Sequence, residues 1–424
     1  MKPLSGFRDL LPSDFARRNY ITTQWREVIS RYGFIEFDGP LLESAELYQK
    51  KNSGGEILTQ LYQFTDRGER PVALRPEMTP TLARIVAAHH REFSKPLRWF
   101  NIGNCFRYER QQRGRLREFL QLNCDLLGEK SPAADAEVIA LLIEILCGFG
   151  FGPKDFVIRL SDRLAWQEFL QTHSVPSERM GEFLSIVDKM EREPREKTEE
   201  KLALFGFGSL SWELLQEFMN SSEVPVLAPL LDELSARGLR EYVKPDLSIV
   251  RGLAYYTGVV FEAFALHGGL RAIAGGGRYD QLIHHLSDGA VNLPAVGFGM
   301  GDAVMLEFLK IVPQATKQEE GWLAAHRGCD IYLVIADESD RARMLGLAQQ
   351  LRHQNVSVLF SLTPERIGKQ FSAAEAALAR FAAVIGAEWP CLKITRLATR
   401  EEIVLPHEEL ACWLLSQQAV EVKS

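Results

Sequence analysis

The chain of 424 residues lacks the features of several large protein classes. No apolar run reaches the roughly 18 residues that a membrane-spanning helix needs, and there is no low-complexity tract or fixed-period repeat. The six cysteines are scattered, with no Cys-x-x-Cys pair and no Cys/His cluster at metal-site spacing. We therefore expect a globular protein with reduced thiols, no membrane span and no resident metal site.

The first residues, Met-Lys-Pro-Leu-Ser-Gly-Phe-Arg-Asp, contain neither an apolar core nor an Arg/Ser-rich amphipathic leader. This favours a cytoplasmic location. The net charge of −7 at pH 7 argues against nucleic-acid binding through bulk charge, so any such contact must depend on local groups.

Two common nucleotide-binding motifs are also missing. The chain has no Gly-x-x-x-x-Gly-Lys-Ser/Thr phosphate loop, and the triplet Gly275-Gly276-Gly277 does not match the dinucleotide fingerprint. P-loop and dinucleotide-binding folds therefore have no support. The triplet itself is open to two interpretations, a turn that needs positive φ or a close approach of backbone to a ligand.

Apolar periodicity predicts the elements of a large first domain. Helices are expected over 14–32, 79–90 and 132–148, a β-hairpin over 98–109 and 118–127, and further strands over 256–264 and 270–274. Residues from about 160 to 240 are charged and helical in pattern, which indicates a helical insertion.

A polar stretch at 317–321 resembles a linker, and a compact α/β pattern follows it. Strands over 330–336, 356–361 and 381–386 alternate with helices over 339–353 and 372–380, before a hairpin over 392–404 and a closing helix from 407. We therefore expect two domains, 1–318 and 319–424.

The second strand of the predicted hairpin carries a polar face. Its residues alternate strictly between polar and apolar, so Gln121, Asn123 and Asp125 share one side. Such a face usually points to solvent. The partner strand, however, puts Arg107 and Glu109 on one face, and guanidinium groups with carboxylates can together hold a zwitterion and a polyphosphate.

Two further segments are open to a structural or a functional interpretation. Glu77 and Thr79 stand at a strand-to-helix turn, where they either cap the helix or reach into a cleft and hold an ammonium group. Tyr255 and Tyr256 precede an apolar strand and serve either packing or recognition.

Six segments together resemble the histidyl-tRNA synthetase family. They are residues 6–12 (Gly-Phe-Arg-Asp-Leu-Leu-Pro), the 74–79 turn, 106–121 with Phe-Arg-Tyr-Glu-Arg, 251–258 (Arg-Gly-Leu-Ala-Tyr-Tyr-Thr-Gly), 274–280 and 294–301. The 251–258 stretch resembles a signature of the histidine enzymes, and 106–109 resembles the second motif of class II synthetases generally.

The resemblance implies an α+β fold, with a class II antiparallel sheet, flanking helices and a helical insertion, followed by a C-terminal α/β anticodon-binding domain. It also implies a homodimer whose substrates are L-histidine, ATP with Mg²⁺, and histidine tRNA. ATP and histidine would form histidyl-adenylate, and the histidyl group would then move to the tRNA.

The resemblance further implies a set of site residues. The amino end of histidine would lie against Glu77, Met78, Thr79 and Gln121, and its imidazole against Asp125, Tyr255 and Tyr256. ATP would contact Arg107, Glu109, Arg115 and Arg251, of which Arg107 and Arg251 would be the catalytic cations at the α-phosphate.

The sequence departs from the family pattern at three positions. Val304 stands where the third class II motif carries an arginine for the γ-phosphate, Ala254 replaces a common Asp, and Asp125 replaces a more usual Glu. Arg271, Arg278 or Mg²⁺ are the candidates for the missing γ-phosphate contact.

These departures leave alternatives open. A non-catalytic regulatory subunit of ATP phosphoribosyltransferase resembles the synthetases and has a similar 74–79 turn, and an RNA-binding adaptor would need only the C-terminal domain. A synthetase branch that includes plant organellar enzymes shares all three departures. Because Arg251 and the C-terminal domain are both present, we favour the synthetase.

Overall fold

The computed structural model describes residues 1–49, 56–110, 114–190, 193–207, 210–221, 223–250, 255–326 and 328–421. The chain divides into two compact units, Met1–Glu319 and Glu320–Ser424. Within the described ranges, no helix has both the length and the apolar character to cross a membrane.

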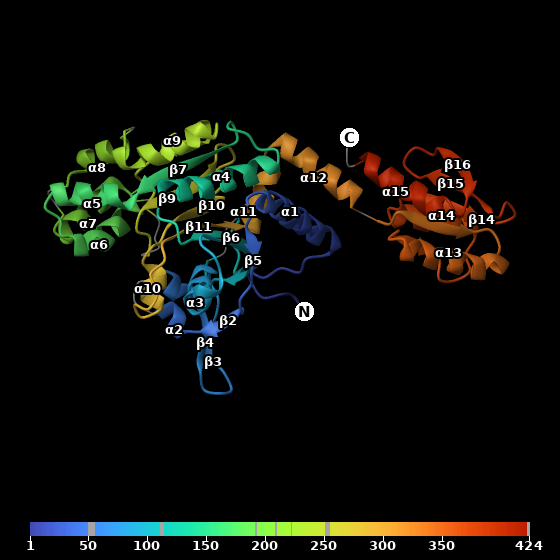
Figure 1. The fold of residues 1–424 in the computed structure, drawn as a ribbon, viewed down its shortest axis with the longest axis horizontal. Helices are drawn as coiled ribbons and strands as arrows, with labels where there is room; N and C mark the ends of the chain where they lie inside the picture. Colours follow the sequence, from blue (N-terminus) through green and yellow to red (C-terminus); the bar gives the residue numbers. More distant parts are fainter. Residues whose placement is uncertain are drawn as a thin grey trace. The chain divides into compact units, whose positions relative to one another are not determined.

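The first unit is built on an eight-stranded sheet (Figure 1). In spatial order the strands are β1 (Ile35–Glu36), β5 (Leu97–Phe106), β6 (Glu118–Leu127), β11 (Ala295–Gly301), β10 (Ala274–Arg278), β9 (Val259–Ala265), β7 (Phe156–Asp162) and β8 (Val243–Pro245). Neighbours from β5 to β7 run antiparallel, while β1 and β8 join the two edges in parallel. The predicted antiparallel sheet is therefore present, with parallel edge strands in addition.

Helices flank this sheet as predicted (Figure 1). They include α1 (Pro12–Arg31), α3 (Thr79–His89), α4 (Pro132–Gly148), α10 (Leu282–Leu286) and α11 (Asp302–Leu309). Helix α2 (Glu46–Gln49) packs on β2 and α3, and α12 (Pro313–Ala325) spans the boundary between the two units. Helix α4 is apolar almost all round, which is typical of a buried helix, and it packs on β6 and β11. It covers the apolar side of β6 and leaves the polar side to the cavity described below.

The segment after β7 is helical in its described parts. It contains α5 (Arg163–Thr172), α6 (Met180–Val187), α7 (Arg195–Leu204), α8 (Trp212–Met219) and α9 (Ala228–Ala236). Strand β7 itself extends to Asp162, just inside the range given to the insertion. A separate three-stranded antiparallel sheet, in the order β2 (Leu42–Ser44), β4 (Pro71–Leu74), β3 (Tyr62–Thr65), leads into the turn before α3.

The second unit is a five-stranded mixed sheet with helices on both faces. The sheet order is β13 (Val358–Phe360), β12 (Ile331–Ile335), β14 (Phe381–Ile385), β15 (Cys391–Arg396) and β16 (Glu402–Pro406), and the helices are α13 (Arg341–His353), α14 (Ile367–Ala376) and α15 (Leu410–Glu421). Alternate residues of β12 enter two apolar clusters, one with α13 and α15 and the other with α14. Burial on both faces explains why β12 is continuously apolar.

Two local predictions need correction. The strand expected over 270–274 is displaced to Ala274–Arg278, so the Gly triplet lies inside β10 and not in a turn. A Cβ at Gly276 would come within 2.2 Å of the Gly297 carbonyl oxygen on β11, so this glycine serves close approach of the strands. Residues 317–321 contain the boundary between the two units, after Glu319, but they are helical as part of α12. There Gln318 donates to the Gly148 carbonyl, and Glu319 pairs with Arg17 at 2.7 Å. The helix expected over 372–380 is also displaced, since α14 spans Ile367–Ala376.

Candidate active site

A cavity of about 790 Å³ opens over the polar side of β6. Its floor is formed by β6, β10 and β11. Its walls come from the turn before α3, the β5–β6 hairpin, the segment before β9, residues 271–275 and the start of α11. The polar face of β6 is therefore not solvent-facing, and Asn123 and Asp125 are only 4% and 3% exposed.

Glycines keep the floor of the cavity open. Asp125 pairs with Gly297 on the neighbouring strand, and Gln121 pairs with Gly301. A Cβ at Gly297 would lie 2.0 Å from the Asp125 Oδ1 atom, so the carboxylate occupies space that only glycine leaves free. A Cβ at Gly299 would likewise lie 2.9 Å from Gln121 Nε2. Gly297 and Gly299 of β11 thus allow the side chains of Asp125 and Gln121 to approach the strand closely, and they do not form a turn.

Asp125 is held by one neighbouring hydroxyl. Tyr279 donates a hydrogen bond of 2.5 Å to Asp125 Oδ1, while Oδ2 is buried with no hydrogen-bond partner among the described residues. Burial raises the pKa of Asp125 to about 7, the Tyr279 hydrogen bond opposes this rise, and the charge of Glu77 adds to it. An unpaired buried carboxylate oxygen at the cavity is suited to accept an N–H from a ligand.

Glu77 reaches the cavity from the turn before α3. The N-cap residue of α3 is Met78, whose side chain makes no capping hydrogen bond. Glu77 accepts a 3.3 Å hydrogen bond from the Tyr255 hydroxyl, and its other oxygen lies 4.0 Å from Arg107. Only 5% of Glu77 is exposed.

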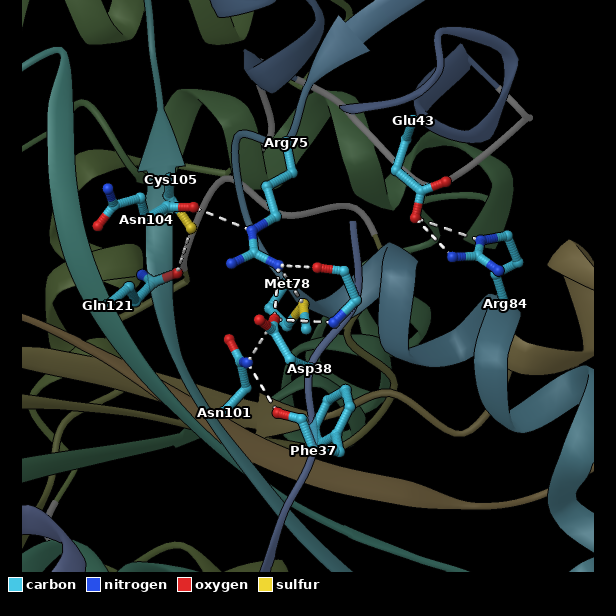
Figure 2. Close-up of polar contacts among 11 residues, drawn as sticks. Phe37, Asp38, Glu43, Arg75, Met78, Arg84, Asn101, Asn104, Cys105 and Gln121 are labelled. Atoms are coloured by element: carbon cyan, nitrogen blue, oxygen red, sulfur yellow. Dashed lines mark hydrogen bonds and ion pairs between the residues drawn. The ribbon is translucent and has the colours of Figure 1, made fainter. Parts of the chain in front are cut away.

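The buried guanidinium of Arg75 anchors this turn (Figure 2). Arg75 Nε donates to the Asn104 carbonyl at 2.9 Å, and Nη1 donates to the Gly39 carbonyl at 2.9 Å and to Asp38 at 3.2 Å. Nη1 also lies 3.5 Å from Met78 Sδ. One side chain therefore ties the turn to both the 38–39 segment and strand β5.

Arginines occupy the cavity wall formed by the β5–β6 hairpin. Arg107 donates to the Pro76 carbonyl at 3.0 Å and lies over the Phe119 ring at 5.4 Å. Arg115 pairs with Glu109, which is 9% exposed. The cavity thus has carboxylates near β10 and the turn, and guanidinium groups near the hairpin.

A family model described as histidyl-tRNA synthetase matches residues 6–303, and a model of an anticodon-binding domain matches residues 330–417. A histidine–tRNA ligase of Opitutus terrae is 40% identical over 96% of both chains. The chain belongs to the histidyl-tRNA synthetase family. A chloroplastic/mitochondrial histidine–tRNA ligase of Arabidopsis thaliana is 39% identical over 77% of this chain and 70% of its own, so the predicted likeness to plant organellar members is confirmed.

Solved structures agree with the fold of this family. A histidyl-tRNA synthetase from Nostoc sp. PCC 7120 superposes with a TM-score of 0.77 at 24% identity, covering 98% of this chain and 99% of its own. A Bacillus halodurans structure described as an ATP phosphoribosyltransferase regulatory subunit/histidyl-tRNA synthetase gives a TM-score of 0.67 at 24% identity, over 88% and 96%. Since both folds are similar, the distinction between them depends on sequence identity and on the site.

The structure brings most of the site residues expected from the family together. Those lining the cavity are Glu77, Thr79, Arg107, Glu109, Arg115, Gln121, Asp125, Tyr255 and Tyr256. Met78 does not line it, because its side chain is fully buried beside Arg75. Arg251 lies outside the described residues, so its predicted role as a catalytic cation stays a prediction.

Sequence reasoning gave no role to Tyr279 and left Arg278 as one of three candidates for the γ-phosphate contact. Tyr279 stands two residues after the Gly triplet, and its period-two position places it on the same side of the chain as Gly275 and Gly277, which is the one available signal. Arg278 is not a phosphate contact. It is 6% exposed and pairs with Asp135 at 2.8 Å and with Asp280 at 3.1 Å, away from the cavity lining.

The described residues contain no group of three His, Cys, Asp or Glu side chains arranged to hold a metal ion. Two carboxylates, Glu109 and Glu262, line the cavity singly.

We expect Gly297→Ala to destabilise the protein by about 1–3 kcal/mol, because the new methyl overlaps the Asp125 carboxylate and forces the side chain or strand to shift. Gly181→Ala, in α6 of the same unit, is the control, since its Cβ meets nothing within 4 Å. It should not destabilise the protein, because Ala favours a helix more than Gly does. Thermal and urea unfolding measure both. Equal stability of the two variants would contradict the close approach at Gly297.

Proposed function

We propose that this chain is a histidine–tRNA ligase, which activates L-histidine with ATP and transfers the histidyl group to the 3′ end of histidine tRNA. The observation that carries the proposal is the Asp125–Tyr279 pair in a cavity whose other end is lined by arginines. The pair offers a buried carboxylate oxygen to a ligand N–H, and the arginines suit a polyphosphate. The family of the chain fits both features.

The histidine end comprises the turn, β6 and the tyrosines. Glu77, Thr79 and Gln121 hold the α-amino group, since a carboxylate and neutral oxygens are suitable acceptors for an ammonium. Asp125 accepts one imidazole N–H, and Tyr256 lies against the ring, with Tyr255 fixed by Glu77. A site of this kind rejects analogues without the ring nitrogens, because its buried polar groups are then unpaired.

The ATP end uses the hairpin and the segment outside the described residues. The histidine carboxylate attacks the α-phosphorus, the bond to the β-phosphate oxygen breaks, and pyrophosphate leaves. Arg107 and Arg251 balance the charge that develops on the α-phosphate, and Arg115 with Glu109 lies farther along the triphosphate. Glu109 and Glu262 would be the oxygen ligands for Mg²⁺ that comes with ATP, and the ion would supply positive charge to the phosphates.

In the second step a terminal ribose hydroxyl of the tRNA attacks the histidyl carbonyl, and AMP leaves. We propose that the C-terminal domain, 319–424, reads the anticodon of this tRNA, and that the catalytic domain is 1–318 with its helical insertion. We also propose a cytoplasmic homodimer. The homodimer rests on the family of the chain.

The alternative is the regulatory subunit of ATP phosphoribosyltransferase. It is less supported, because relatives over most of the chain are histidine–tRNA ligases and the C-terminal domain matches an anticodon-binding model. Histidine-dependent ATP–pyrophosphate exchange on the purified protein tests the choice. A full-length protein with neither exchange nor tRNA charging would favour the regulatory alternative.

Arg251→Ala should lower the exchange rate by about 10²-fold or more while changing histidine affinity little, the pattern of a group that acts mainly in the transition state. Steady-state exchange kinetics with separate histidine titration measure the two effects. Exchange near the wild-type rate would remove Arg251 from the catalytic set.

The KM for histidine should rise as the pH falls below about 7, because Asp125 must be ionised to accept the imidazole N–H and its pKa is raised to about 7. In Tyr279→Phe the opposing hydrogen bond is lost, so the pKa of Asp125 rises and the increase in KM begins at higher pH. The imidazole of free histidine titrates in both assays and cancels in the comparison. Asp125→Ala should raise the histidine KM by about tenfold. In that variant, the further change Tyr279→Phe should no longer shift the pH dependence of the histidine KM. An ATP KM that rose in place of the histidine KM would assign Asp125 to the nucleotide.

Truncation should separate the two steps. A chain ending at Ala325 retains all of α12, and should keep histidine–ATP exchange while charging tRNA at least about tenfold more slowly, because the anticodon contacts are lost. Parallel exchange and charging assays on the truncated and full-length proteins measure this. Undiminished charging by the truncated protein would exclude the anticodon role.

A further inference from the structure

The far end of the cavity is uncharged on the side of α11. Ala303 and Val304, in the first turn of that helix, line the cavity and bring no charge to it. The preceding residue, Asp302, is fully buried and accepts from Arg8 at 2.8 Å and from the Leu120 amide at 3.1 Å. Helix α11 therefore supplies the cavity with no cation.

A cation approaches the same end from the neighbouring strand. In the β10–β11 ladder the last pair is Ala274 with Met300, two residues before α11 begins. Arg271 precedes Ala274 by three residues, so the antiparallel register carries it past the end of β11 towards the start of α11. Arg271 is exposed and lines the cavity.

The register also separates Arg271 from the histidine end. Gly297 lies beside Asp125, and Gly301 is four residues farther along β11, which is about 13 Å at the usual rise of a strand. Arg271 lies beyond Gly301 in this direction. The hairpin loop bounds the same end, since a Cβ at Gly114, next to Arg115, would lie 3.2 Å from Val304 Cγ2.

Three arginines stand among the described lining residues, namely Arg107, Arg115 and Arg271. Arg107 and Arg115 belong to the hairpin wall, where they contact Glu77 and Glu109. A triphosphate carries several negative charges in a small volume, so a guanidinium group at the α11 end would add to those of the hairpin.

We propose that Arg271 binds the terminal phosphates of ATP and supplies, from the lead-in to β10, the positive charge that Val304 does not supply from α11. The inference rests on the proposed function, because it assigns a role within the ATP end of that site. The remaining side-chain candidate, Arg278, is excluded by its paired and buried position.

Binding of ATP and of AMP to the full-length protein tests this role, because a contact to the terminal phosphates affects only ATP. Arg271→Ala should weaken ATP binding by about tenfold or more and AMP binding by less than about twofold, as expected for one lost charge-assisted contact. Arg91→Ala, an exposed arginine outside the cavity lining, is the matched control and should bind both nucleotides as the wild type does.

A charge-relocation variant makes the test independent of folding. In Arg271→Ala/Val304→Arg the guanidinium returns to the same end of the cavity from the α11 side, and ATP affinity should recover to within about threefold of the wild type. The histidine KM in pyrophosphate exchange should be unchanged in every variant.

Three results would overturn the inference. They are unchanged ATP affinity in Arg271→Ala, an equal loss for ATP and AMP, and no recovery in the relocation variant. If the wild-type protein shows histidine-dependent ATP–pyrophosphate exchange and Arg271→Ala keeps the wild-type ATP affinity, this inference alone is overturned. A wild-type protein without exchange would overturn the proposed function.

Discussion

The burial of Arg75 is the constraint on which the site depends. Its guanidinium is inaccessible to solvent, and it donates to the carbonyls of Asn104 and Gly39 and to the carboxylate of Asp38. A charge removed from water is costly unless it is paired and hydrogen-bonded. The turn that carries Arg75, residues 38–39 and strand β5 can therefore separate only if the guanidinium group loses its partners. Strand β5 accommodates the group at Gly103, where a Cβ would lie 2.0 Å from Nη2. The contacts of Arg75 therefore fix the turn that presents Glu77.

The site also depends on the antiparallel pairing of β6 with β11 and of β11 with β10. Its register sets Asp125 against Gly297 and Gln121 against Gly301, and it brings Tyr279 to the carboxylate across 154 residues of chain. The same ladder carries Arg271 to the start of α11. Asp125 and Tyr279 thus meet in one cavity because the sheet places their strands close together, although the helical insertion separates them in the sequence.

Local patterns predicted much of this arrangement, and contacts between distant segments account for the errors. The strict alternation in β6 predicted that Gln121 and Asp125 share a face, because strand periodicity is a local property. The Gly triplet was misjudged, since glycine weakens an isolated strand and only the approach of Gly297 and its neighbours requires it in β10. Residues 317–321 have the polarity of a linker, and their helix depends on partners at Arg17 and Gly148 that no local pattern contains.

The glycines of β11 at the floor of the cavity limit how the ligand preference of the site can change in evolution. Gly297 and Gly299 already have the smallest side chain, so mutation there can only remove space, and the overlaps with Asp125 and Gln121 show that little is spare. Adaptation to a larger ligand would have to come from the walls, where Tyr255 and Tyr256 are the bulky groups. The backbone of β11 therefore sets an upper limit on ligand size at the floor of the cavity, and substitutions in the walls do not change this limit.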